Sequence, residues 1–336
     1  MECKDKKQCL TPTHAVLIKK GQAISIKITS PVLPNPNVEL VIMIKPRLAP
    51  RPAPPFGHFQ KLRWSTYYGG SDFDESKHIS TDISGNIYLT FGTFSSDVST
   101  LDPGGSAYFD STYGGEWDAF LVKFNNQGVR LWATYFGGLR LEIPVSSITD
   151  NSGNFYMFGR VDTYGGNNPC GVPTNNGFPL CDPGGNTWFQ GTLGGCTCPF
   201  TECMEIFISK FDSAGVLQWS TYYGGSFGND TPENNGVAID ASGNIYLVGW
   251  TLSQNFPTHD PGGGAYFDST YSSTNFLIPD AFIIKFSAQG ERLWATCYGG
   301  NDDDRGHDIS IDIQGNVFII GETRSTDLPV KNLHTS

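Results

Sequence analysis

The sequence is short of charge, and of basic charge in particular. Only 16% of the residues are charged, and 22 lysines and arginines stand against 33 acidic residues, which gives a net charge of −11. A nucleic-acid-binding protein needs a basic surface, so we expect no nucleic-acid partner. No apolar run approaches the roughly 18 residues of a membrane-spanning helix, so we expect no membrane insertion. The N-terminal stretch is basic but lacks the apolar core of a signal peptide.

The signatures of common enzymes are missing as well. The six histidines are scattered, and there is no G-x-S-x-G elbow, no H-E-x-x-H pair and no phosphate-binding glycine loop. We therefore expect no catalytic residues, no enzymatic activity and no organic cofactor. One alternative stays open, a hydrolase or lyase that acts on polysaccharides, because acidic residues are numerous and two of them can suffice for glycosidic cleavage.

Glycine and aromatic residues, in contrast, are abundant. The chain has 40 glycines, and 13% of its 336 residues are aromatic. This composition is typical of many short strands joined by tight turns, and it differs from that of a disordered chain. No segment predicts a helix.

Four phrases return along the chain in a fixed order. The first has the form Asp-x-x-Gly-Asn followed by an apolar run, and it begins at Asp82, Asp150, Asp240 and Asp312. The second resembles W-[SA]-T-Y-Y-G-G, with its tryptophan at Trp64, Trp132, Trp219 and Trp294. The third resembles DAFLVKF and begins at Asp118, Glu205 and Asp280. The fourth is DPGG, which begins at Asp102, Asp182 and Asp260. Such a tandem array indicates a repeat architecture, whatever the role of any single residue.

Each repeat predicts four antiparallel strands, A to D. Strand A leads into the Asp-x-x-Gly-Asn turn, strand B is the apolar run after it, and the third and second phrases form strands C and D. Strand B is apolar at nearly every position, which indicates burial on both faces. Four-stranded units stacked around an axis are the blades of a β-propeller, so we predict an all-β propeller. A solenoid is the rival architecture, but its repeats are usually shorter. The predicted blades cover about 78–135, 146–223 and 234–298, with a partial blade from 307–323 and 62–67.

The combined phrases resemble the SBBP-type β-propeller repeat of bacterial secreted and cell-surface proteins, from about Leu62 to Pro329. More distantly they resemble NHL-type blades, which share the Asp-x-x-Gly-Asn hairpin. The resemblance implies an extracellular or cell-surface location, and it implies little about activity. The family name implies seven blades, which this chain does not contain.

The two ends of the array do not decide whether the blades close into a ring. Residues 1–58 form an N-terminal region with strands and a Pro-rich linker, and residues 59–336 hold the repeats. The segment Val38–Lys45 is a candidate for the C strand that the fourth blade lacks, next to the D phrase at Leu62–Tyr67. In that case about four blades close through pairing of the N- and C-terminal strands. Otherwise the chain is a fragment of a larger propeller.

The D–A loops and the B–C connections are expected on one face, which is the predicted binding face because its loops are long and varied. Acidic residues in these loops are candidate Ca²⁺ ligands, since Ca²⁺ binds clustered oxygens. They are Asp72, Asp74, Asp230, Asp302, Asp303 and Asp304. Solvated turn residues are the alternative interpretation. Three tryptophans, Trp117, Trp188 and Trp250, are candidates for stacking on a ligand, with core packing as the alternative.

Five of the eight cysteines fall in one long connection between strands B and C. They are Cys170, Cys181, Cys196, Cys198 and Cys203. We predict disulfides among them if the protein is exported, because a long insertion gains most from cross-links. A zinc site is the alternative, but the C-x-x-C spacing and a nearby histidine are missing.

Together these patterns predict a monomeric, non-enzymatic propeller module for surface recognition or scaffolding, with an unidentified protein or glycan as partner. The polysaccharide-acting enzyme would use the same face.

Overall fold

The computed structural model describes residues 26–28, 38–44, 62–162, 177–194, 204–226, 228–271 and 277–330. The chain divides into two compact units, Met1–Gly70 and Ser71–Ser336. None of the described residues belongs to a helix of the length and apolar character needed to cross a membrane.

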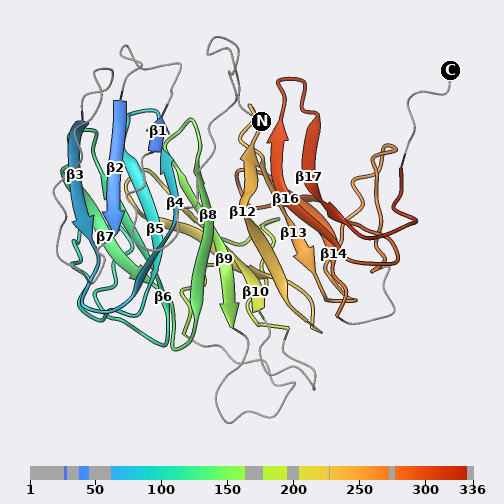
Figure 1. Cartoon of the computed structure of the whole chain (residues 1–336), viewed down its shortest axis with the longest axis horizontal. Helices are drawn as coiled ribbons and strands as arrows, with labels where there is room; N and C mark the ends of the chain where they lie inside the picture. The colour runs from blue at the N-terminus through green and yellow to red at the C-terminus, as the bar shows by residue number, and fades with distance from the viewer. Residues whose placement is uncertain are drawn as a thin grey trace, which may run out of the picture. The chain divides into compact units, whose positions relative to one another are not determined.

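The larger unit contains two four-stranded antiparallel sheets and a six-stranded sheet, in which a third four-stranded blade is joined to a two-stranded half-blade (Figure 1). Blade I contains β4 (Asp74–Thr81), β5 (Ile87–Thr93), β6 (Asp118–Phe124) and β7 (Arg130–Phe136). Blade II contains β8 (Glu142–Thr149), β9 (Phe155–Asp162), β10 (Met204–Phe211) and β11 (Leu217–Tyr223). Blade III contains β12 (Asp230–Ile239), β13 (Ile245–Thr251), β14 (Asp280–Phe286) and β15 (Arg292–Tyr298). Half-blade IV contains β16 (Asp304–Ile311) and β17 (Val317–Thr323). The fold is therefore all-β and propeller-like in its described part, and each sheet follows chain order from A to D.

The first strands of successive blades are neighbours. Packing links β4 to β8, β8 to β12 and β12 to β16, and Asn235 of β12 forms a parallel bridge with Asp308 of β16. These inner strands are the ones that line the axis of a propeller.

The Asp-x-x-Gly-Asn turns form as the sequence predicts. The Asp82 carboxylate accepts hydrogen bonds from the backbone N–H of Ser84 at 3.0 Å and of Asn86 at 2.8 Å. Gly85 has a φ of 77°, a region that glycine enters without steric cost. The same arrangement recurs at Asp150, Asp240 and Asp312. The aspartate of this phrase is thus a turn cap in all four repeats.

A glycine late in each B strand faces an irregularity in strand A. In blade III, Gly249 pairs with Pro232, where the register of β12 shifts before Val237. A Cβ atom on Gly249 would collide with the carbonyl oxygen of Thr231 and lie 2.9 Å from Cα of Pro232. The glycine is therefore required by the close approach of two backbones.

We expect Gly249→Ala to lower the free energy of unfolding by about 2–3 kcal/mol, because the added methyl group overpacks a site bounded by backbone. Urea denaturation followed by tryptophan fluorescence measures this. The control is Gly262→Asn, at an exposed turn position with a φ of 73° and open space around it. Asparagine tolerates this conformation, so the control should lose less than about 1 kcal/mol. Equal losses would contradict the role given to Gly249.

The core lies between the blades. Tyr88, Leu121 and Phe136 of blade I pack against blade II through residues such as Phe207 and Phe211. An equivalent cluster joins blades II and III. Trp132 and Trp219 are buried in these clusters, at 2% and 3% exposure. Trp132 and Trp219 of the D phrase therefore serve packing between blades.

The smaller unit contains β1 (Ile26–Ile28), β2 (Val38–Ile44) and β3 (Leu62–Tyr68) in the order β1-β2-β3. Strand β2 pairs antiparallel with β1 and parallel with β3. A C strand must run antiparallel to its D strand, so the predicted C–D pair of Val38–Lys45 and Leu62–Tyr67 does not form with this polarity. Closure of the ring by these strands is not confirmed.

Candidate functional site

The predicted Ca²⁺ ligands lie in three different repeats. Among the described residues no group of three or more His, Cys, Asp or Glu side chains has the geometry to hold a metal ion. The carboxylate of Asp74 accepts a 2.6 Å hydrogen bond from Thr93, and that of Asp304 accepts bonds from Ser325 and the Gly300 N–H, both at 2.7 Å. These acids thus hold loops in place. The exposed Asp72 and the half-buried Asp302 each accept a bond from the next N–H in the chain. Calcium binding stays a prediction.

Asp230 is fully buried at the start of β12. Its carboxylate accepts hydrogen bonds from the hydroxyls of Thr251 and Ser253 and from the Gly225 N–H. Burial nevertheless raises the pKa of Asp230 to about 6, because these bonds offset only part of the lost hydration. Burial also raises the pKa of Asp118, at the start of β6, to about 6.

The three predicted ligand-stacking tryptophans are not brought together, and each contacts other side chains. Trp117 packs against Phe94, with ring centroids 4.7 Å apart. The guanidinium of Arg292 lies 4.0 Å from the ring centroid of Trp188, and that of Arg305 lies 4.8 Å from that of Trp250. Cation–π contacts of this kind occupy the ring face that a sugar would need.

The cysteine prediction falls mostly outside the described residues, which include neither Cys170, Cys196, Cys198 nor Cys203. Cys181 is described, and it is a free thiol whose Sγ lies 3.5 Å from the Gln218 carbonyl. Cys297 is a free, buried thiol in the core between blades II and III.

The DPGG connections do not stay on the predicted face. After strand B each connection runs along the outer edge of strand D, with bridges from Leu101 to Ala133, Cys181 to Ser220 and His259 to Ala295. Tyr108 then donates its N–H to Gly215, in the C–D turn of the next blade. The expected grouping of DPGG with the D–A loops is therefore wrong. The connection covers an edge strand that would otherwise expose unpaired backbone groups.

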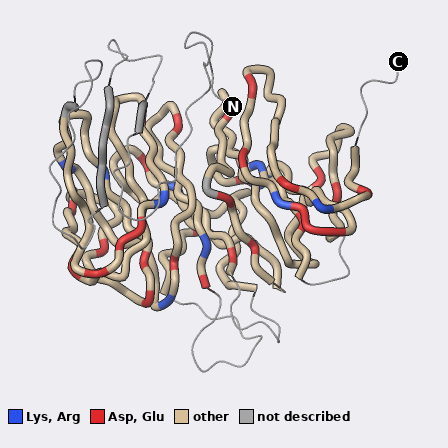
Figure 2. The backbone as a smooth tube through the Cα atoms, in the orientation of Figure 1, with Lys and Arg blue, Asp and Glu red and all other residues tan. Residues whose placement is uncertain are grey.

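The D–A loop before β16 lies instead beside a group of mostly charged side chains on β12, β16 and the B strands β13 and β17, which we term the inner cluster. It consists of Glu233, Trp250, Arg305, His307 and Glu322. Figure 2 shows acidic and basic positions close together along these C-terminal strands.

Contacts within the inner cluster connect four strands, β12, β13, β16 and β17, and a loop. The Trp250 indole donates a 3.1 Å hydrogen bond to Glu233, and the two ring nitrogens of His307 lie 3.8 Å from Glu233 and from Glu322. Arg305 donates a 2.9 Å bond to Asp303 in the preceding loop. Because His307 is 43% and Glu322 is 59% exposed, a ligand can reach both.

Arg160 of β9 extends this charged surface. Burial lowers the pKa of its guanidinium, while the charges of Glu233 and Glu75 oppose that shift. Its Nε is buried and has no hydrogen-bond partner among the described residues. This surface thus carries both signs of charge, and the half-buried Arg160 has one nitrogen without a hydrogen-bond partner among the described residues.

The sequence contains a signal for these residues that the repeat analysis did not use. Arg160, Trp250 and Glu322 each directly follow the recurrent glycine of strand B, where blade I has Thr93. The glycine is constant in all four B strands, while the residue after it varies in charge and size. Variation at one position of a fixed frame is what a repeat fold uses to build a binding surface.

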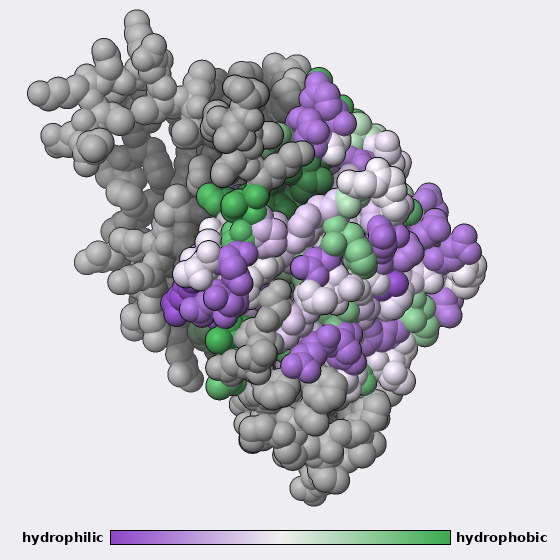
Figure 3. Space-filling view, turned by 90° about the vertical axis from the view of Figure 1, so that its right-hand side faces the viewer, coloured by the Kyte–Doolittle hydropathy of each residue, from purple (hydrophilic) through white to green (hydrophobic). Residues whose placement is uncertain are grey.

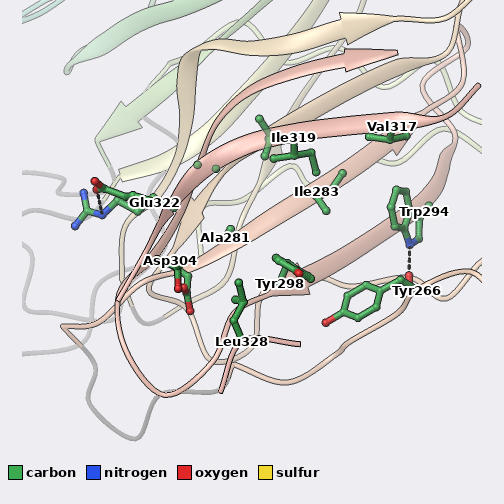
Figure 4. Close-up of a pocket in the computed structure, with 15 residues that line it drawn as sticks. Tyr266, Ala281, Ile283, Trp294, Tyr298, Asp304, Val317, Ile319, Glu322 and Leu328 are labelled. Atoms are coloured by element: carbon green, nitrogen blue, oxygen red, sulfur yellow. Dashed lines mark hydrogen bonds and ion pairs between the residues drawn. The ribbon is translucent and has the colours of Figure 1, made fainter. Parts of the chain in front are cut away.

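A second feature is an apolar pocket of about 410 Å³ between blade III and half-blade IV (Figure 4). Its apolar lining includes Ile283, Trp294, Tyr298 and Ile319, and Asp304 lies at its edge. The Trp294 indole donates to the Tyr266 carbonyl at 3.1 Å.

Comparisons with known proteins agree with this architecture. A β-propeller repeat family, SBBP, matches residues 63–90, 218–257 and 293–329. The chain is also 23% identical, over 220 residues and 61% of its length, to an uncharacterized WD repeat-containing protein, L264, of Acanthamoeba polyphaga mimivirus. It spans only 14% of that viral protein. The recurring phrases and the antiparallel sheets agree with these three matches, so the matched segments are similar to SBBP-type β-propeller repeats.

Proposed function

We propose that this chain is a non-enzymatic recognition module that binds another protein through the inner cluster. The observation that carries the proposal is the solvent-accessible, mixed-charge network of Glu233, Arg305, His307 and Glu322 on β12, β16 and β17. Charged groups of both signs on a rigid scaffold favour orientation-specific contacts with a protein surface.

Two observations favour a protein over a glycan. The candidate stacking tryptophans Trp188 and Trp250 each have an arginine over one ring face, and Trp117 packs on Phe94, so each of these three rings already has a partner. The buried acids Asp230 and Asp304 accept hydrogen bonds from loop groups, which favours a structural role over acid–base cleavage of polysaccharides. The family resemblance extends the proposal to a site of action on the bacterial surface. Protease treatment of intact producing cells tests that location.

We expect Arg305→Glu to weaken binding by at least tenfold, because reversing this charge places it against Asp303 and Glu322 and removes the cation offered to a partner. Peptide arrays of mixed-charge sequences and glycan arrays, probed with the purified chain, identify the ligand class. Titration at two salt concentrations then measures affinity. Arg130→Glu, on strand β7 far along the chain from the cluster, makes the same charge change as a control.

Two results would contradict the proposal. One is equal loss of binding in both variants, because the inner cluster would then have no special role. The other is turnover of any polysaccharide in a hydrolysis screen of the same preparation, which would favour the enzyme.

A further inference from the structure

The four A strands of the larger unit share an irregularity at the same place. In β4, β8, β12 and β16 the register against strand B shifts directly after the third residue of the strand. A β-bulge of this kind re-aims the side chain that it carries, and bulges are common next to binding sites. The residue that follows the shift differs from blade to blade. These residues are Lys77, Val145, Glu233 and His307.

Two of these bulge residues, Glu233 and His307, meet in the inner cluster. Strands β12 and β16 are joined there by the parallel bridge between Asn235 and Asp308. Nδ1 of His307 lies 3.8 Å from Oε1 of Glu233, and its Nε2 lies 3.8 Å from Oε1 of Glu322 on β17. Both distances exceed the roughly 3.2 Å limit of a nitrogen–oxygen hydrogen bond. His307 therefore lies between two carboxylates and is hydrogen-bonded to neither.

Solvent reaches all three of these side chains. Glu233, His307 and Glu322 are 25%, 43% and 59% exposed. Figure 3 looks at the side of the molecule that carries the C-terminal strands, where hydrophilic and apolar residues share the surface. Among the described residues the Glu322 carboxylate has only ion-pair contacts, at 3.8 and 4.0 Å. The Glu233 carboxylate accepts one hydrogen bond, from the Trp250 indole. Both carboxylates can therefore accept hydrogen bonds from a partner.

Arg305 does not neutralise these two glutamates. Its guanidinium donates two hydrogen bonds to the Asp303 carboxylate, at 2.9 and 3.3 Å, and lies 4.8 Å from the ring centroid of Trp250. Its Nε is 4.0 Å from Glu322, which is too far for a hydrogen bond. The arginine is therefore held mainly by the loop before β16.

The charged groups around His307 are mostly acidic. They are Glu233 from β12, Glu322 from β17, and Asp303, Arg305 and Asp308 from β16 and the loop before it. Strand β13 contributes Trp250, which is uncharged, and Arg160 of β9 interacts electrostatically with Glu233. Acids outnumber arginines in this set while His307 is neutral. An acidic excess of this kind favours a cationic group on the partner.

We propose that a lysine or arginine side chain of the partner protein binds to Glu322 beside His307, and that protonation of His307 displaces it. This inference rests on the binding function proposed above, in which Arg305 takes a carboxylate of the partner. Neutral His307 leaves both glutamates available. A proton taken up from water makes both ring nitrogens donors, so His307 then pairs with Glu233 and Glu322 and places a like charge beside the partner's cation. Acidification therefore weakens binding.

The test uses the full chain and the mixed-charge peptide that binds best on the array. Its affinity is measured at about pH 5.5 and about pH 8, on either side of the range in which histidine changes its charge. We expect wild type to bind about tenfold more weakly at the lower pH. In His307→Gln, which cannot take up the proton, the two affinities should differ by less than about twofold. His259→Gln is the matched control, because His259 is exposed on the connection beside β15, and it should keep the full pH effect.

A second measurement locates the partner's cation. At about pH 8, Glu322→Gln should weaken binding about tenfold, and so should glutamine in place of the lysines and arginines of the peptide. The two changes together should weaken binding little further, because they remove the same contact. Circular dichroism at both pH values checks that each variant is folded.

Peptide binding that depends on Arg305 but is equal at both pH values would overturn this inference and leave the proposed function intact. A pH effect that persists in His307→Gln would equally overturn it, as would additive losses from Glu322→Gln and the altered peptide. If no peptide binds at either pH, the proposed function fails and the inference fails with it. The buried Asp230 titrates in every variant, so comparison of variants at the same pH removes its effect.

Discussion

Phe136→Ala is expected to lower the free energy of unfolding by about 3–5 kcal/mol, the range seen for large cavities in aromatic cores. Phe136 is fully buried, and its ring lies 5.1 Å from that of Phe178 and 5.4 Å from that of Phe211 (centroid distances). Blades I and II meet at this ring, so its removal weakens two sheets at once. Urea denaturation of the full chain at neutral pH gives the measurement.

The matched control for that variant is Leu131→Ala. Leu131 lies on the same strand, β7, but is 37% exposed. Its truncation leaves no cavity, and we expect a loss of less than about 1 kcal/mol. If both variants lose the same free energy, the aromatic cluster between blades does not dominate stability and the packing account is wrong.

When the pH is lowered from 7 to 4.5, the contribution of Asp230 to the free energy of unfolding is expected to rise by about 2 kcal/mol. Its pKa is about 6 in the folded chain against 3.8 in the unfolded chain. A raised carboxyl pKa means that the folded state binds the proton more tightly. The stabilising contribution is therefore fully present below about pH 4 and is lost as the pH rises through 6.

Asp118 acts in the same direction, and His78 opposes both. Burial lowers the pKa of His78 from 6.5 to about 4, and its Nδ1 lies 3.0 Å from the Ser147 hydroxyl. The unfolded chain takes up this proton first as the pH falls, so the contribution of His78 is present above 6.5 and is lost toward pH 4. The wild-type curve is the sum of these opposed effects.

Comparison with Asp230→Asn isolates the carboxyl group. The variant should gain about 2 kcal/mol relative to wild type between pH 4.5 and 7, because an amide avoids the cost of a buried charge. Chemical denaturation at five pH values gives both curves, and the exposed Glu291→Gln controls for the change in net charge. Parallel curves for Asp230→Asn and wild type would show that Asp230 titrates alike in both states.

The hairpins and blades were predictable from the sequence because their determinants are local. An aspartate four residues before an asparagine, with glycine between them, holds its own turn together through bonds that span at most four residues. The apolar B strands predicted burial between sheets for the same reason, since each blade must cover its neighbour.

The course of the DPGG connections and the inner cluster were not predictable in this way. Tyr108 bonds to Gly215, and Arg160 is influenced by Glu233 and Glu75. These partners come from different repeats and carry no common sequence signal. Strand polarity at the N-terminus likewise depends on which strands meet in space, and apolar alternation does not encode it.

The amino-acid sequence alone thus determined the repeat unit, its four strands and the capped turns between them, because those depend on contacts within a few residues or on a period that repetition makes visible. Only the tertiary structure decided which acids are buried caps and which charges meet in the inner cluster. Those properties arise from the stacking of blades, where residues distant in the chain lose water together and each pKa and each exposed edge depends on what the next blade supplies.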